Sequence, residues 1–210
     1  MKLRDWVRKH WQLAVNWVLF VGIGVGIVVK AWRWHQAGEL WQPVEIALLA
    51  QLIVFLALLI LRTRHIAIDR NLFHQGVALA AFFAGLAFIG EKTTDASLLW
   101  SARAVTFVGS VIGILTLVNL GSSFGILIAR RRIKTGWLYG IVRHPMYLAA
   151  ILIKIGMVLK IPSWQNVAVF VGAVACYVYR AILEERFLAH SADYREYMKK
   201  VRYRLLPGVF

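Results

Sequence analysis

The residues best suited to chemistry are concentrated in the last third of this 210-residue chain. A short stretch holds a basic motif between two tyrosines, and two adjacent acids follow further along. A polar tail then brings more tyrosine and arginine. In chain order these residues are Tyr139, Arg143-His144-Pro145, Tyr147, Glu184-Glu185, Tyr194, Tyr197 and Arg204.

The basic motif predicts an anion site at the start of a helix. Proline is well placed in the first helical turn, where its missing N–H costs nothing, so Pro145 predicts a helix start. Arg143 and His144 then lie beside a helix N-terminus, whose free amides favour a carboxylate or a phosphate. Carboxylates such as Glu184 and Glu185 suit the opposite partners, an ammonium group or a ribose diol.

The two acids also admit a purely structural interpretation. They are predicted at the C-terminal end of a helix, where negative charge opposes the helix dipole, so a cation must lie close by. Arg143, Glu184, Glu185 and Arg204 could form a salt-bridge cluster that ties a helical hairpin to the tail, because structural ion pairs also gather such residues.

Composition assigns the elements that carry these residues to a membrane. The chain is 60% hydrophobic, with a mean hydropathy of +0.65, above the usual content of soluble domains. We expect an all-α, polytopic transmembrane protein of about six spans, with a C-terminal helical hairpin and a cytosolic amphipathic tail helix. The six apolar segments are about 11–30, 43–61, 72–90, 100–120, 145–160 and 164–183.

The distribution of basic residues sets the predicted orientation. With six spans, 19 of the 25 Lys and Arg residues fall on one side and four on the other. The positive-inside rule assigns the richer side to the cytoplasm, so both termini are predicted to be cytoplasmic in the inner membrane. The formal charge of +15 therefore reflects orientation, and no nucleic-acid partner is expected.

Other candidate motifs favour structural readings. The six histidines form no pair with metal-ligand spacing, so no metal site is expected. Gly22, Gly24 and Gly26 lie inside an apolar span and favour close helix packing over nucleotide binding. Lys154 lies inside the fifth segment. It is either a functional intramembrane charge or a side chain that reaches the membrane boundary.

The ordered motif closely resembles the isoprenylcysteine carboxyl methyltransferase family, which shares its layout with phospholipid N-methyltransferases. The resemblance rests on Arg143-His144-Pro145-x-Tyr147, on Glu184-Glu185 and on the tail from Tyr194 to Pro207, and covers roughly residues 120–208. It implies N-terminal transmembrane helices over 1–120 and a cofactor-binding, methyltransferase-like region over 121–210. The implied cofactor is S-adenosyl-L-methionine, and the implied partner, besides the bilayer, is a lipophilic acceptor: a prenyl-cysteine-like carboxylate, a phospholipid amine or another small lipid or thiol.

The resemblance also implies site residues. Arg143 and Glu184 are the expected catalytic residues. The expected cofactor-binding residues are Tyr139, Val142, His144, Pro145, Tyr147, Glu185, Arg204 and Leu206.

Two alternatives stay open at the level of sequence. Membrane reductases similar to the steroid 5α-reductases use a related proline and tyrosine element with NADPH, but commonly continue with Gly-Glu where this chain has Leu148-Ala149. The second alternative is a non-enzymatic membrane scaffold. The motif does not identify the acceptor or the oligomeric state.

Overall fold

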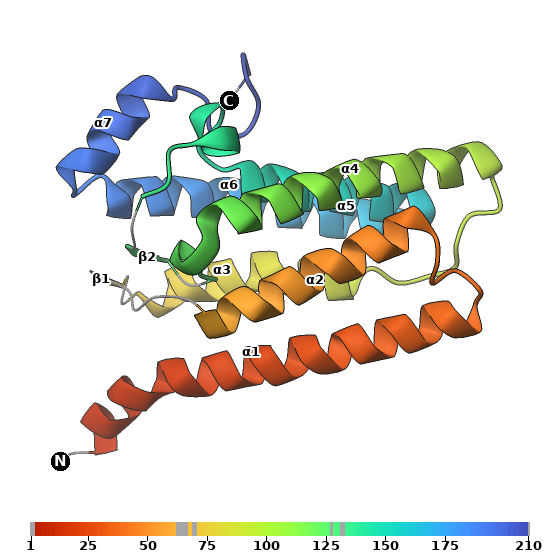
Figure 1. Ribbon diagram of the computed structural model, residues 1–210, viewed down its shortest axis with the longest axis horizontal. Helices are drawn as coiled ribbons and strands as arrows, with labels where there is room; N and C mark the ends of the chain where they lie inside the picture. Colours follow the sequence, from red (N-terminus) through yellow and green to blue (C-terminus); the bar gives the residue numbers. More distant parts are fainter. Residues whose placement is uncertain (1–2, 62–66, 69–70, 127, 131–132, 210) are drawn as a thin grey trace.

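Six helices lie side by side in an elongated bundle (Figure 1). The computed structural model describes the backbone of residues 3–61, 67–68, 71–126, 128–130 and 133–209. Its elements are α1 (Leu3–Gln36), α2 (Pro43–Leu61), β1 (Ala67–Ile68), α3 (Leu72–Phe83), η1 (Ala84–Ala87), α4 (Ala96–Leu120), η2 (Gly121–Ser123), β2 (Ala129–Arg130), η3 (Trp137–Gly140), α5 (Pro145–Lys160), α6 (Trp164–Leu188) and α7 (Ala192–Lys200).

The expected all-α membrane architecture is confirmed. Helices α1 to α6 occupy the six predicted apolar segments. Four stretches of the described chain are long and apolar enough to cross a bilayer: Trp17–Gln36, Pro43–Leu61, Ala96–Ser123 and Trp164–Leu188. Helices α3 and α5 have 12 and 16 residues, fewer than the roughly 20 that a span needs. The count of six crossings therefore stays a prediction.

The connections at one end of the bundle bring distant segments together. The N-terminal end of α1, the α2–α3 and α4–α5 connections and α7 all lie toward the left in Figure 1. There β1 pairs antiparallel with β2. Which compartment this end faces stays a prediction, and six of the basic residues counted for it lie outside the described residues: Lys2, Arg62, Arg64, Arg70, Arg131 and Arg132.

Helices α4 and α5 pack closely because glycines remove side chains from their contact. A Cβ atom on Gly156 would lie 2.9 Å from the backbone oxygen of Ala102, and the Thr106 side chain already fills the same space. A Cβ atom on Gly109 would lie 3.1 Å from the backbone oxygen of Ala149. Small residues allow such close approach between membrane helices, which fixes α5 against α4.

The far end of the bundle is closed by a tight turn between α5 and α6. Pro162 lies in the turn, and Ser163 caps α6 by accepting a hydrogen bond from the backbone N–H of Asn166. The fully buried Asn166 amide donates to the carbonyls of Ile161 and Ile89 and accepts from the Ile89 N–H. These bonds fix the turn to the α3–α4 connection, so α6 returns to the end from which α5 started.

Candidate functional site

The C-terminal tail lies against the start of α5. Pro145 occupies the first turn of α5, as predicted, and His144 precedes it. The backbone N–H of Arg143 donates to the carbonyl of Tyr203 at 2.9 Å, and that of His144 donates to Arg204 at 2.8 Å. The basic motif and the tail, about 60 residues apart in sequence, are therefore held together by main-chain bonds, which are largely independent of side-chain identity.

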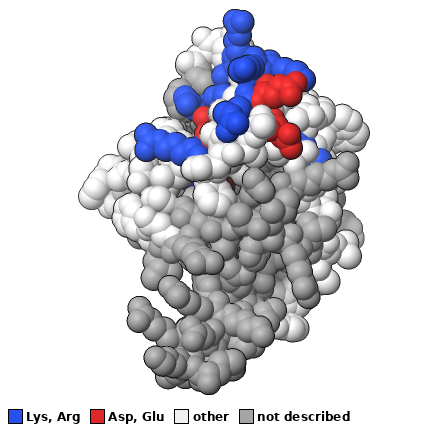
Figure 2. Space-filling model, turned by 90° about the vertical axis from the view of Figure 1, so that its left-hand side faces the viewer, with Lys and Arg blue, Asp and Glu red and all other residues white. Residues whose placement is uncertain are grey.

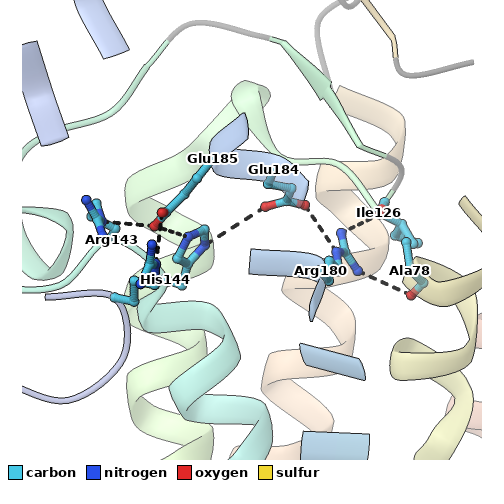
Figure 3. A network of polar contacts seen from close by, with 8 residues as sticks. Ala78, Ile126, Arg143, His144, Arg180, Glu184 and Glu185 are labelled. Carbon is cyan, nitrogen blue, oxygen red and sulfur yellow. Dashed lines mark hydrogen bonds and ion pairs between the residues drawn. The ribbon is translucent and has the colours of Figure 1, made fainter. Parts of the chain in front are cut away.

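Glu185 joins two arginines and a histidine at the end of α6 (Figure 3). Its carboxylate accepts from Arg204 Nε at 2.9 Å, lies 2.9 Å from Arg143 Nε and 3.1 Å from His144 Nε2, and its side chain is only 7% exposed. The Arg143 contact is an ion pair without an aligned hydrogen bond, because the buried Nε–H has no acceptor in line with it. Three of the four residues of the predicted salt-bridge cluster, Arg143, Glu185 and Arg204, thus meet at Glu185.

Glu184 points to the other side of the same helix end. It accepts a hydrogen bond of 3.1 Å from Arg180 Nε, one helical turn earlier, and its carboxylate lies 4.0 Å from His144 Nδ1. Arg180 is fully buried and also donates to the main-chain carbonyls of Ala78 and Ile126 (Figure 3). Arg180 therefore orients Glu184 and ties the end of α6 to α3 and to the segment after α4.

A stack of rings supports the basic motif from inside the bundle. The rings of His144 and Tyr147 lie parallel, 5.1 Å apart, and the Arg180 guanidinium lies 5.2 Å from the centre of the Tyr147 ring. Tyr177 packs behind Tyr147 at 5.5 Å, and the ammonium of Lys154 donates a 3.0 Å hydrogen bond to the Tyr177 hydroxyl. Lys154 thus faces α6.

These groups surround a cavity of about 140 Å³. Its wall contains both polar or aromatic side chains and apolar ones. The polar and aromatic lining residues include Lys134, Tyr139, Arg143, His144, Tyr147, Glu184, Tyr194 and Tyr197. The apolar lining residues include Leu120, Ile128, Ile133, Met146 and Leu188. The cavity therefore offers both charge and hydrocarbon to a ligand.

The tyrosines of η3 and α7 enter the cavity wall as neutral rings. Burial raises the pKa of Tyr139 well above its ordinary value. Burial, reinforced by the Glu184 and Glu185 carboxylates, raises the pKa of Tyr194. Burial also raises the pKa of Tyr197, whose hydroxyl donates a 2.7 Å hydrogen bond to the Tyr139 carbonyl. This bond holds η3 against α7, whose apolar face packs on Ile133 and Leu188.

The structure brings most of the predicted site residues together. Tyr139, Arg143, His144, Tyr147 and Glu184 line the cavity. The other predicted residues lie outside its lining: Val142 and Pro145 are buried in the motif itself, Glu185 and Arg204 form the ion cluster, and Leu206 is 46% exposed.

Sequence reasoning placed Tyr194 and Tyr197 in this region without assigning them to the site, and it gave Arg180 no role in the site. The spacing of Arg180 to Glu184, which makes the pair neighbours on one helix face, is a signal that could have identified the arginine. Lys134 gave no such signal, because it lies in an irregular connection.

Comparison with known proteins agrees with this arrangement. Residues 105–192, from within α4 to the first residue of α7, match the family model described as phospholipid methyltransferase. A search of curated proteins gives no significant match. The matched segment contains the basic motif and both glutamates, and so includes Arg143, His144 and Glu185 of the ion cluster. Residues 105–192 therefore form a phospholipid methyltransferase domain, which is a member of the isoprenylcysteine and phospholipid methyltransferase superfamily.

Proposed function

We propose that the protein transfers a methyl group from S-adenosyl-L-methionine to a lipophilic acceptor at the membrane interface. The observation that carries this proposal is the cavity, whose lining combines charged and aromatic groups with hydrocarbon. All of its lining residues except Tyr194 and Tyr197 lie within the region that matches the methyltransferase family. A reaction between a polar donor and a lipid needs both kinds of wall in one place.

The residues present fit the proposed cofactor. Arg143 lines the cavity with a side chain only 9% exposed, and its Nε–H has no aligned acceptor in the described structure. A buried guanidinium with donors to spare suits the carboxylate of an amino-acid moiety. Glu184 suits an ammonium group or a ribose diol, and tyrosine faces suit a sulfonium cation or an adenine ring.

The proposed residue roles concern binding, orientation and the exclusion of water. When bound, S-adenosyl-L-methionine supplies an electrophilic methyl group on a positively charged sulfur. Arg143 would bind an anionic group and hold the ligand in register, while Tyr139 and Tyr147 would enclose it. Leu120, Met146 and Leu188 would exclude water from the acceptor side. Such positioning supplies most of the catalysis available to an in-line displacement.

Glu184 would act next to the reacting groups, because it lines the cavity and Arg180 fixes its orientation. If the acceptor is an amine, its nitrogen forms the new bond to carbon and must release a proton, and Glu184 is the nearest carboxylate on the cavity wall. A carboxylate or thiolate acceptor would need no such base. The proposed role of Glu185 is to hold Arg143 and His144 in place.

Calorimetry on the purified protein in detergent tests the proposal. We expect S-adenosyl-L-methionine to bind in a saturable manner, and Arg143→Ala to weaken this binding. Radiolabel from the methyl group should then appear in the lipid extract of wild-type membranes and be absent from Glu184→Ala membranes. Absence of binding by the wild-type protein, with folding confirmed by a cooperative thermal transition, would remove the proposal.

Thermal unfolding of the same purified protein distinguishes a methyltransferase from a reductase. We expect the thermal unfolding temperature to rise with S-adenosyl-L-methionine and to stay unchanged with NADPH, because ligands stabilise the state that binds them. The opposite pattern would favour the reductase. No response to either ligand would favour a scaffold.

A further inference from the structure

Exposed apolar side chains lie outside the helices that qualify as spans, on two segments near the cavity. Trp137 and Ile141, in and just after η3, are 67% and 56% exposed. Tyr203 and Leu206, in the tail after α7, are 40% and 46% exposed. Contiguous apolar groups on a water-facing surface usually mark a site of interaction.

These side chains are held in fixed positions. Main-chain hydrogen bonds join Arg143 to Tyr203 and His144 to Arg204, so η3 and the tail form one unit at the start of α5. Between the exposed Tyr203 and Leu206, Arg204 is tied to Glu185 and Leu205 is 6% exposed. Along the tail, residues that are buried or hydrogen-bonded to the bundle therefore alternate with exposed residues. The bonds fix the direction of the exposed side chains.

Basic residues accompany the apolar ones. Between residues 186 and 202, exposed Lys and Arg residues outnumber exposed acidic ones. The five Lys and Arg residues are Arg186, Arg195, Lys199, Lys200 and Arg202, and the two acidic residues are Asp193 and Glu196. In Figure 2, Lys and Arg side chains gather over the side of the molecule where α7 and the tail lie. In Figure 1, η3 and the tail run along the flank of the bundle beside α4 and α6, and do not extend beyond the ends of these helices.

We propose that Trp137, Ile141, Tyr203 and Leu206, together with Lys199, Lys200 and Arg202, form a surface that docks on anionic phospholipid headgroups. This surface, called here the tail surface, combines the two features of interfacial segments: apolar and aromatic groups that enter the headgroup layer, and bases that bind its negative charge. Each base near an anionic leaflet adds to the electrostatic attraction. The occupant is the bilayer that surrounds the protein, and the proposal does not depend on the methyl-transfer activity.

A spin label on the tail surface tests this directly. Cys176 is the single cysteine, so Cys176→Ala provides the background for Leu206→Cys and for Glu196→Cys, a control at an exposed position on α7. Each variant is labelled and reconstituted in vesicles of phosphatidylcholine alone and of phosphatidylcholine with an equal amount of phosphatidylglycerol. Collision rates with oxygen and with a water-soluble nickel complex report the depth of the label.

We expect the label at 206 to favour oxygen over nickel, more strongly in the anionic vesicles, and the label at 196 to favour nickel in both. When Lys199→Glu, Lys200→Glu and Arg202→Glu are added, the oxygen preference of the label at 206 should no longer depend on lipid charge. Arg33→Glu, at the opposite end of the bundle, should leave this dependence unchanged. A label at 206 as accessible to nickel as that at 196 would overturn the proposal. So would an oxygen preference that is independent of lipid charge, or a label shielded from both reagents, which would indicate a protein partner.

Discussion

Lys154 and Tyr177 form a buried hydrogen bond of 3.0 Å between α5 and α6. The ammonium lies 5.0 Å from the centre of the tyrosine ring, so it bonds the hydroxyl at the ring's edge and does not cover its face. Because Tyr177 packs against Tyr147, and Tyr147 lines the cavity, this bond connects a charge inside the bundle to the wall of the site. Intramembrane charges are costly and usually serve a purpose.

Lys154→Met should weaken cofactor binding without weakening the fold. Methionine keeps the volume of the stem but removes the donor, so Tyr177 and then Tyr147 lose their support. We expect the dissociation constant for S-adenosyl-L-methionine to rise about tenfold, the size of one lost hydrogen bond to a charged group. The unfolding temperature should stay constant or rise, because an apolar replacement removes a desolvation cost.

Tyr177→Phe provides the matched control, since it removes the hydroxyl and keeps the ring. The two single variants should have equal effects, and the double variant should be no worse than either, as expected for two halves of one interaction. Fully additive losses, or unchanged binding in Lys154→Met, would show that the lysine does not act through Tyr177.

Neutralising Glu184 and Glu185 one at a time should show that Glu185 mainly supports stability and Glu184 mainly supports methyl transfer. Glu185→Gln leaves the buried Arg143 and the half-buried Arg204 near an uncharged partner, and we expect a loss of about 3 kcal/mol in the free energy of unfolding. Glu184→Gln should cost less stability, because Arg180 keeps two carbonyl acceptors, but it should greatly reduce methyl transfer. Denaturant unfolding in detergent and transfer of labelled methyl groups give the two readouts. Equal behaviour of the two variants would contradict the division of roles.

Gly156→Ala should destabilise the contact between α4 and α5. The added methyl group would meet the Thr106 side chain and the Ala102 backbone, and overpacking of this kind typically costs 1–3 kcal/mol. Gly172→Ala in α6 is the control, because no atom lies within 4 Å of its added Cβ. That variant should be neutral or slightly stabilising, since alanine is the better helix former. A thermal melt of both variants decides the comparison.

Tyr197 should make stability depend on pH in the alkaline range. Burial raises its pKa above the ordinary value of 10.0, so the folded protein keeps the proton that the unfolded chain releases. The stabilising contribution is therefore complete below about pH 10 and declines as the pH rises above that value. The difference in unfolding temperature between wild type and Tyr197→Phe should be largest below pH 10 and shrink above it. A difference that grows with pH would contradict this assignment.

Sequence reasoning located the helices and the meeting of the two motifs, for reasons that can be named. Apolar length and turn residues fix both ends of α2 and α5 and the start of α6 almost without tertiary information, whereas α6 continues to Leu188, beyond the predicted end at 183. The contact between Arg143 and Glu185 follows from a hairpin that returns to the end where it began.

The division between Glu184 and Glu185 could not be predicted in the same way. It depends on how α6 is rotated about its axis relative to α5, and that rotation is set by packing of many side chains. The exposure of Leu206 depends on the hydrogen bonds between the tail and the basic motif, which involve main-chain atoms and leave no trace in residue type. The pairing of β1 with β2 gave no sequence signal either, because each strand has only two residues.

The close contact of α4 with α5 restricts how a lipid could reach the cavity. At Gly109 and Gly156 one helix comes close to the backbone of the other, at Ala149 and Ala102, so this contact leaves little room for a passage between the two helices. An acyl chain moving in from the bilayer must therefore travel around α5 on the side away from α4, or past the connection that follows α4. The close contact between α4 and α5 would therefore direct lipids toward other parts of the bundle. The point of lipid entry would lie where helices contact each other through side chains alone.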